Sequence, residues 1–183
     1  MTYKKRPDGR EFDEMRKMEA KIGIIKNADG SAMFRFGDTI AIAAVYGPKP
    51  LHPQHLQNPR RGLLRCNYDM LSFSVPERKK PGPSRRSQEI SKVTEWALSN
   101  VIDLDQYPNT VVDVHVMILQ ANASTRCAGI NAASLALASA GVSMKEMISA
   151  VSIGKIDDRI VVDFIKEEED YEEGEGATDI PMA

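Results

Sequence analysis

The loop QANASTRCAG (residues 120–129) carries hydroxyl and guanidinium groups at the predicted start of a helix. Ser124, Thr125 and Arg126 open that helix, where backbone N–H groups lack intrahelical partners and the helix dipole is positive. Arginine can bind two oxygens of one phosphate, so these groups together suit a phosphate-sized anion. The alternative is an ordinary capped helix with a surface arginine.

A second predicted helix begins with two adjacent arginines, Arg85 and Arg86. Each cation at a helix N-terminus opposes the dipole and costs about 0.3–1 kcal/mol. The pair follows the basic connector PERKKPGP (residues 76–83), so a bound polyanion would offset the repulsion. This pattern indicates a surface that handles nucleic acid.

Charge is strongly segregated along the chain. Residues 58–92 contain nine Lys/Arg and three Asp/Glu, a net +6, whereas residues 157–183 contain two Lys/Arg and eleven Asp/Glu, a net −9. The acidic stretch offers Asp170 and Asp179. Carboxylates near nucleic-acid phosphates are unfavourable unless they hold a metal ion or donate a proton. The alternative for each charged stretch is a solvated face.

Composition narrows the class of protein. The chain has 183 residues, of which 42% are hydrophobic and 27% charged, as expected for one soluble domain. Cys66 and Cys127 fit no metal or redox spacing, and Pro53 between His52 and His55 argues against a zinc site. The N-terminus has no apolar signal region and no apolar run is long enough to span a bilayer, so we expect a soluble intracellular protein.

Apolar periodicity and turn residues predict alternating strands and helices. The predicted elements are two strands in 31–46 around a Gly-Asp turn, a strand in 62–75, a helix from about 85 to 100, a strand at 110–120, a helix at 126–140 ended by Gly141, a β-hairpin at 148–164 and an acidic loop at 166–179. Ser84 is the predicted N-cap of the first helix, with Ile90, Val93 and Ala97 as its apolar stripe. This order predicts an α+β domain with mixed sheets.

Taken in order, these stretches resemble the RNase PH family of phosphorolytic exoribonucleases, and the catalytic subunits of archaeal exosomes more than the bacterial enzymes. The match covers nearly the whole chain. The stretches that carry it are RPDGREFDEMR (6–16), the hairpin at 28–48, the block at 52–93 that contains HPQHLQ and ERKKPGPSRR, the loop and helix at 119–142, and EEEDYEEGEGATDIPMA (167–183).

The resemblance implies a fold of duplicated β-α units of the ribosomal protein S5 domain 2 type, with mixed sheets. It implies one RNase PH-like domain over residues 1–183, which lacks the further strand and the long C-terminal helix of the family. It also implies a cytoplasmic hexameric ring in which catalytic subunits alternate with an inactive paralogue. RNA-binding cap subunits would then feed single-stranded RNA into the central channel.

The resemblance also implies roles for individual residues. Ser124, Thr125 and Arg126 would bind the attacking inorganic phosphate, which is the co-substrate. Arg85 and Arg86 would hold phosphates at the RNA 3′ end, and Arg65 would contact RNA nearer the channel. Asp170 and Asp179 would form the catalytic acidic pair, with Asp179 as the proton donor or as a ligand of Mg²⁺.

The implied reaction is reversible phosphorolysis, which removes nucleoside diphosphates from RNA 3′ ends. Two alternatives remain open at this point. The first is an inert RNA-binding ring subunit, and Asp179 argues against it because inactive paralogues lack the acidic pair. The second is a bacterial-type enzyme that trims tRNA 3′ ends, and the block at 52–93 argues against it.

The sequence departs from the family pattern in the loop before the second helix and in the acidic segment. Asn122 and Ser124 stand where the family usually carries Asp and Gly, so a side chain crowds the approach to the backbone amide. Asp170 and Asp179 are nine positions apart, a longer spacing than usual, with Gly174 and Gly176 between them.

Overall fold

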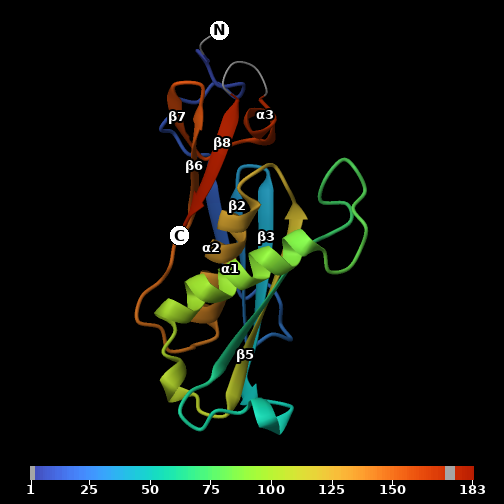
Figure 1. The fold of residues 1–183 in the computed structure, drawn as a ribbon, viewed down its shortest axis with the longest axis vertical. Helices are drawn as coiled ribbons and strands as arrows, with labels where there is room; N and C mark the ends of the chain where they lie inside the picture. The colour runs from blue at the N-terminus through green and yellow to red at the C-terminus, as the bar shows by residue number, and fades with distance from the viewer. Residues whose placement is uncertain (1–2, 172–175) are drawn as a thin grey trace.

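The computed structural model describes residues 3–171 and 176–183, so Gly174 lies outside the described residues. Figure 1 shows an elongated molecule with a large sheet and two long helices below and a small sheet above. The elements in chain order are β1 (Met18–Ile22), β2 (Gly30–Phe36), β3 (Thr39–Pro50), η1 (Gln54–Leu56), β4 (Leu63–Met70), α1 (Arg85–Val101), η2 (Leu104–Gln106), β5 (Thr110–Gln120), α2 (Thr125–Ser139), β6 (Val151–Ile156), β7 (Arg159–Val162), α3 (Lys166–Glu169) and β8 (Ala177–Met182).

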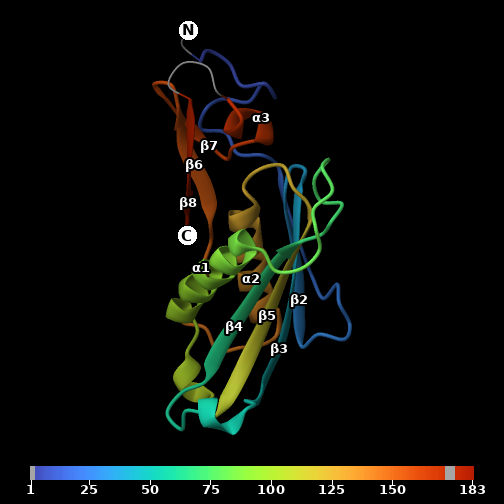
Figure 2. The ribbon, with the colours of Figure 1, turned by 45° about the vertical axis from the view of Figure 1, so that its right-hand side comes forward.

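The large sheet is mixed, as the sequence predicted. Its strand order is β1-β2-β3-β5-β4, with β4 parallel to β5 and every other pair antiparallel. Both long helices cover the same face of this sheet, which Figure 2 shows from the side. The small sheet has the order β7-β6-β8 and is antiparallel.

Strand β5 forms the centre of the main core. The alternating residues Val112, Val114, Val116 and Ile118 are all buried, as their spacing predicted. Helix α2 packs close to the sheet because most of its buried positions are small residues, four of them alanine. A Cβ atom at Gly30 of β2 would lie 2.4 Å from the carbonyl oxygen of Ala136, so this contact requires glycine.

Helix α1 begins at Arg85, as predicted, and ends one residue beyond the predicted end. Ser84 is its N-cap, and its hydroxyl accepts a hydrogen bond from the Ser87 N–H at 3.0 Å. The predicted apolar stripe is wrong at Val93 and Ala97, which are only half-buried. The buried positions are Ser87, Ile90, Thr94, Leu98 and Val101, so small polar residues take part in the face that meets the sheet.

Three segments differ from the sequence prediction. The strand predicted at 62–75 ends at Met70, where a turn leads into the basic connector. Strand β1 was not predicted. The segment expected to be an acidic loop contains the short helix α3 and strand β8. Strand β8 carries Pro181, which is tolerated there because β8 is an edge strand that pairs with β6 alone.

An N-terminal arm, residues 3–17, crosses the small sheet and fastens α3 through Arg6. The Arg6 guanidinium is fully buried and donates to both carboxylate oxygens of Glu168, at 2.8 and 2.9 Å. It also donates to the carbonyl oxygens of Val162 and Asp163. Within the described residues, no helix is both long and apolar enough to cross a membrane.

We predict that Arg6→Met lowers the free energy of unfolding by about 3–5 kcal/mol, because Glu168 would keep a buried charge without a partner. Urea denaturation followed by circular dichroism measures this change. Arg35→Met is the matched control, since the ion pairs that Arg35 makes with Glu19 and Asp38 are exposed, and we expect a change under about 1 kcal/mol. Equal losses in the two variants would contradict the prediction.

Candidate active site

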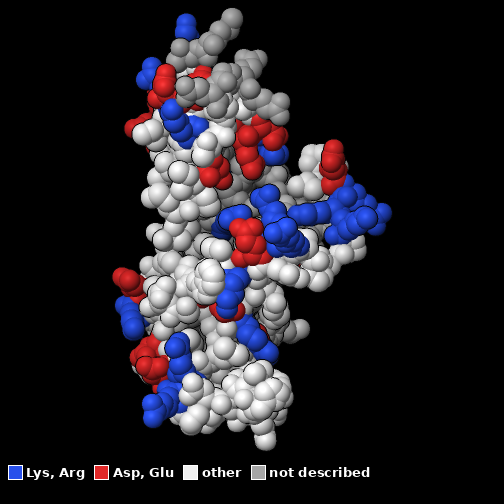
Figure 3. All heavy atoms as spheres, viewed as in Figure 1, with Lys and Arg blue, Asp and Glu red and all other residues white. Residues whose placement is uncertain are grey.

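A cavity of about 650 Å³ lies where the large and small sheets meet. Its walls come from the end of β4, the basic connector, the first turns of α1 and α2, and from β6, α3 and β8. The charged residues that line it are Glu77, Arg78, Lys79, Arg86, Arg126, Lys166, Glu169, Asp170 and Asp179. Figure 3 shows basic side chains over the connector and the start of α1, with acidic side chains near α3.

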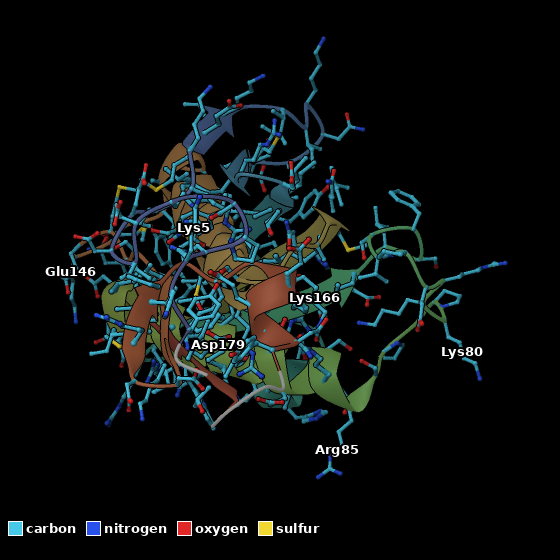
Figure 4. The ribbon with its side chains drawn as sticks, turned by 90° about the horizontal axis from the view of Figure 1, so that it is seen from above. Lys5, Lys80, Arg85, Glu146, Lys166 and Asp179 are labelled. Atoms are coloured by element: carbon cyan, nitrogen blue, oxygen red, sulfur yellow. The ribbon has the colours of Figure 1, made fainter. Side chains whose placement is uncertain are left out.

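The cavity brings together six of the eight residues predicted from the sequence. These are Arg86, Ser124, Thr125, Arg126, Asp170 and Asp179. Arg85 and Arg65 are not among its lining residues. In Figure 4, Arg85 points away from the body of the molecule, while Asp179 and Lys166 lie towards its middle. The roles in RNA binding that the sequence predicted for Arg65 and Arg85 stay predictions.

The loop before α2 has an unusual backbone, since Ala123 and Ser124 are both left-handed with φ of 53°. Ser124 is the N-cap of α2, yet its side chain makes no capping hydrogen bond. Its hydroxyl turns inward and donates to the Asp163 carboxylate at 3.1 Å. The N–H groups at the start of α2 therefore do not receive the usual side-chain cap, which favours an anion at this position.

Arg126 is held across the two helices by a residue of α1. Its Nη2 lies 3.1 Å from Oε1 of Glu89, whose side chain is 55% exposed. An ion pair this exposed contributes only about 0–1 kcal/mol, so a phosphate can compete with Glu89 for the guanidinium.

The two predicted catalytic carboxylates reach the cavity from different elements. Asp179 lies on β8, opposite Gly154 of β6, and accepts a hydrogen bond from the buried hydroxyl of Ser152. Asp170 ends α3, and its Oδ1 lies 2.5 Å from Nζ of Lys166. The hydrogen bond to Asp170 raises the pKa of Lys166, so this ammonium stays charged.

The described residues hold no cluster of three or more His, Cys, Asp or Glu side chains that could bind a metal by themselves. Mg²⁺ usually binds through one or two carboxylates together with substrate phosphates. Asp179 fits that kind of site because it lines the same cavity as the start of α2.

Arg65 is engaged outside the cavity. Its guanidinium donates to both carboxylate oxygens of Asp113, at 2.7 and 3.1 Å, and Nζ of Lys49 lies 2.7 Å from the same carboxylate. Burial alone would raise the pKa of Asp113, but the hydrogen bonds from Arg65 and Lys49 outweigh it and lower the pKa. The side chain of Arg65 is 44% exposed, so part of the guanidinium remains accessible.

Sequence reasoning missed Lys166 and Ser152, which contact the two candidate carboxylates directly. Lys166 stands four residues before Asp170, a spacing that forms ion pairs on a helix. That signal was hidden because the segment was expected to be a loop. Nothing in the local sequence marks Ser152, which meets Asp179 only through the pairing of β6 with β8.

Comparisons with known proteins cover nearly the whole chain. The family model "3′ exoribonuclease family, domain 1" matches residues 14–143, and its domain 2 matches residues 146–175. The chain is 53% identical over 179 residues to the exosome complex component Rrp41 of Thermococcus kodakarensis, covering 98% of this chain and 70% of the relative. It is 47% identical over 178 residues to that component of Archaeoglobus fulgidus, covering 97% and 67%.

Two solved structures share the fold. Rice Rrp46 superposes with a TM-score of 0.80 at 28% identity, covering 90% of this chain and 75% of that one. A chain of the Archaeoglobus fulgidus exosome, solved with RNA bound to its active site, also gives a TM-score of 0.80 at 25% identity. That match covers 97% of this chain and 76% of the other.

We predict that Gly154→Ala separates β8 from β6 and so displaces Asp179. A Cβ atom at position 154 would lie 1.9 Å from the Thr178 carbonyl oxygen and 2.6 Å from the Phe164 ring. Hydrogen exchange should show loss of protection of the β8 amides, with β5 still protected. Ile160→Ala is the control because Ile160 is 70% exposed on β7. Protection of β8 that matches the wild type would refute the prediction.

Proposed function

The chain belongs to the 3′ exoribonuclease family, and from this premise we propose that it is the catalytic subunit of an exosome, which degrades RNA from the 3′ end by phosphorolysis. The proposal rests on one observation. The start of α2, Arg86, Arg126 and the Asp179 carboxylate all line the same cavity. The archaeal relatives favour an exosome subunit over a bacterial-type enzyme that trims tRNA.

The reaction requires two anions to approach each other, because inorganic phosphate attacks a phosphodiester. Two unit charges 4 Å apart repel by about 1 kcal/mol in water and by about 4 kcal/mol at an effective dielectric constant near 20. Arg86 and Arg126 enter the cavity from the starts of the two long helices and would offset that repulsion. Fixed cations also stabilise the charge that develops on the transferring phosphoryl group.

We assign the attacking phosphate to the start of α2, where Thr125 and Arg126 meet it with backbone N–H groups, a hydroxyl and a guanidinium. Ser124 contributes its backbone, since its hydroxyl is turned towards Asp163. Arg86 holds the phosphate of the terminal nucleotide, with Arg78 and Lys79 of the connector lining the same wall. Arg65 and Arg85 would contact RNA farther from the reacting bond.

In the proposed step, a phosphate oxygen forms a bond to the terminal phosphorus and the bond from phosphorus to the leaving 3′-oxygen breaks. The terminal nucleotide departs as a nucleoside diphosphate, and the 3′-oxygen of the shortened RNA takes up a proton. Asp179 delivers that proton or holds Mg²⁺, which would supply positive charge to the leaving oxygen. Asp170 pairs with Lys166, and both line the cavity. The same site can run the reaction backwards and extend RNA.

The partners of the proposed enzyme are RNA and other exosome subunits. We further propose the hexameric ring with an inactive paralogue, the RNA-binding cap and the cytoplasmic location that the sequence predicted. The single RNase PH-like domain over residues 1–183 also stays a prediction.

We predict that the full-length protein, assembled with its partner ring subunit, degrades poly(A) only when inorganic phosphate is present and releases ADP. Thin-layer chromatography of labelled products measures this directly. Asp179→Asn in the same assembly should abolish turnover and leave RNA binding largely intact, because the carboxylate acts on the leaving oxygen. Release of AMP, or degradation without phosphate, would refute phosphorolysis. Turnover by Asp179→Asn at the wild-type rate would remove Asp179 from the step.

The two adjacent arginines of α1 differ in position, because Arg86 lines the cavity and Arg85 does not. We predict that Arg86→Ala weakens RNA binding by about 10-fold or more, since a hydrogen bond to a charged group contributes about 1.5–3 kcal/mol. It should also reduce the slope of log K against log salt concentration by about 1, which corresponds to the loss of one phosphate contact. Arg85→Ala removes the same charge from a side chain outside the cavity, so we expect a smaller loss. Fluorescence anisotropy at several salt concentrations compares them, and equal losses would contradict the assignment.

A further inference from the structure

We propose that Arg16 and Asp163 are positioning residues that hold the phosphate loop, residues 121–125, in the shape that binds inorganic phosphate. The inference rests on the proposed function and adds two residues to which no role has been given. Neither lines the cavity. They therefore act through the loop and do not touch the substrate.

The loop needs such support because its backbone is intrinsically unfavourable. Ala123 and Ser124 are consecutive left-handed residues, and neither is glycine. This conformation costs about 1–2 kcal/mol for each L-residue. It persists only where surrounding contacts determine it, which often occurs at ligand-binding sites.

Arg16 reaches the loop from the N-terminal arm. Its Nη1 donates to the Asn122 carbonyl oxygen at 2.6 Å, directly before the left-handed pair. The rest of the guanidinium is fixed by Asp163, to which Nε and Nη2 donate at 2.8 and 2.6 Å. The Arg16 backbone N–H donates to the same carboxylate at 2.9 Å. The arginine has therefore little freedom to move away from the loop.

Asp163 completes the connection from the other side. Its side chain is 1% exposed, and it accepts the hydrogen bond from the Ser124 hydroxyl. Burial by itself would raise the pKa of Asp163, but hydrogen bonds and charge from Arg16, with a smaller effect of Arg10, lower the pKa. The carboxylate is therefore ionised at neutral pH and can accept from Arg16 and Ser124 together.

Thr39 and α3 support the loop independently. The Thr39 hydroxyl accepts from the Asn122 N–H at 3.0 Å and lies 2.9 Å from the carbonyl oxygens of Asn122 and Ala123, to which it can donate. The Lys166 N–H donates to the Asn122 side chain at 2.8 Å. These contacts fix the peptide groups on both sides of Ala123, the first of the two strained residues.

The arrangement has a direct consequence for phosphate binding. By accepting from the Ser124 hydroxyl, Asp163 draws that side chain away from the cavity and prevents it from capping α2. The N–H groups at the start of α2 are then left for an anion. Ser124 stands where the family usually carries glycine, and its side chain is accommodated because it turns towards Asp163.

The test is steady-state kinetics of the full-length protein assembled with its partner ring subunit. Asp163→Asn should raise KM for inorganic phosphate on the order of 10- to 100-fold, as expected when a binding group shifts by about 1 Å. KM for RNA, measured at saturating phosphate, should change much less. Asp158→Asn is the matched control, because Asp158 lies on the exposed turn of the same hairpin and contacts only Lys155 among the ion pairs of the described residues.

Arg16→Lys keeps the test decisive if Asp163→Asn fails to fold. Lysine keeps a positive charge beside the buried Asp163, but its single nitrogen cannot reproduce both the two bonds to that carboxylate and the bond to the Asn122 carbonyl oxygen. KM for phosphate should therefore again rise selectively. A folded Asp163→Asn or Arg16→Lys assembly with wild-type KM for phosphate would overturn the inference. Degradation of RNA by the wild-type assembly in the absence of phosphate would instead refute the proposed function.

Discussion

The buried ion pair between Arg6 and Glu168 fastens the N-terminal arm to α3 beside the small sheet. Both side chains are almost completely removed from water, so neither charge can be left without the other. Arg16 and Asp163 make a second buried pair a short distance along the same segments. Because both arginines belong to the N-terminal arm and both acids follow β7, the arm ties the small sheet to the large one. The cavity between the sheets depends on this connection.

The link between the two sheets matters for the electrostatics of the proposed reaction. The large sheet and its helices supply the cations Arg86 and Arg126, whereas the small sheet and α3 supply Asp170 and Asp179. Groups that bind anions and a group that can act on a leaving oxygen thus come from separate layers. A preorganised site of this kind does not need to reorient its charges during the reaction. Rigid contacts between the layers matter for that reason.

Much of the fold could be predicted from local patterns. The alternating valines of β5 determined a buried strand, and Ser84 followed by a helical sequence determined the start of α1. The prediction failed where long-range pairing decides the structure. Strand β8 contains an aspartate and a proline, both of which disfavour strands, so its hydrogen bonds to β6 make it a strand. The face of α1 was predicted incorrectly because Thr94 and Ser87 are buried despite their hydroxyl groups.

The sequence by itself determined which chemical groups are available: the arginines at helix starts, the hydroxyl groups of the loop and the acidic pair. Tertiary structure decided which of them meet. Neighbouring residues of a helix point about 100° apart, so Arg86 faces the cavity while Arg85 does not. Ser124 turns inward because Asp163 lies behind it, 39 residues along the chain. Such a contact depends on how separate elements pack, and no local pattern contains that information.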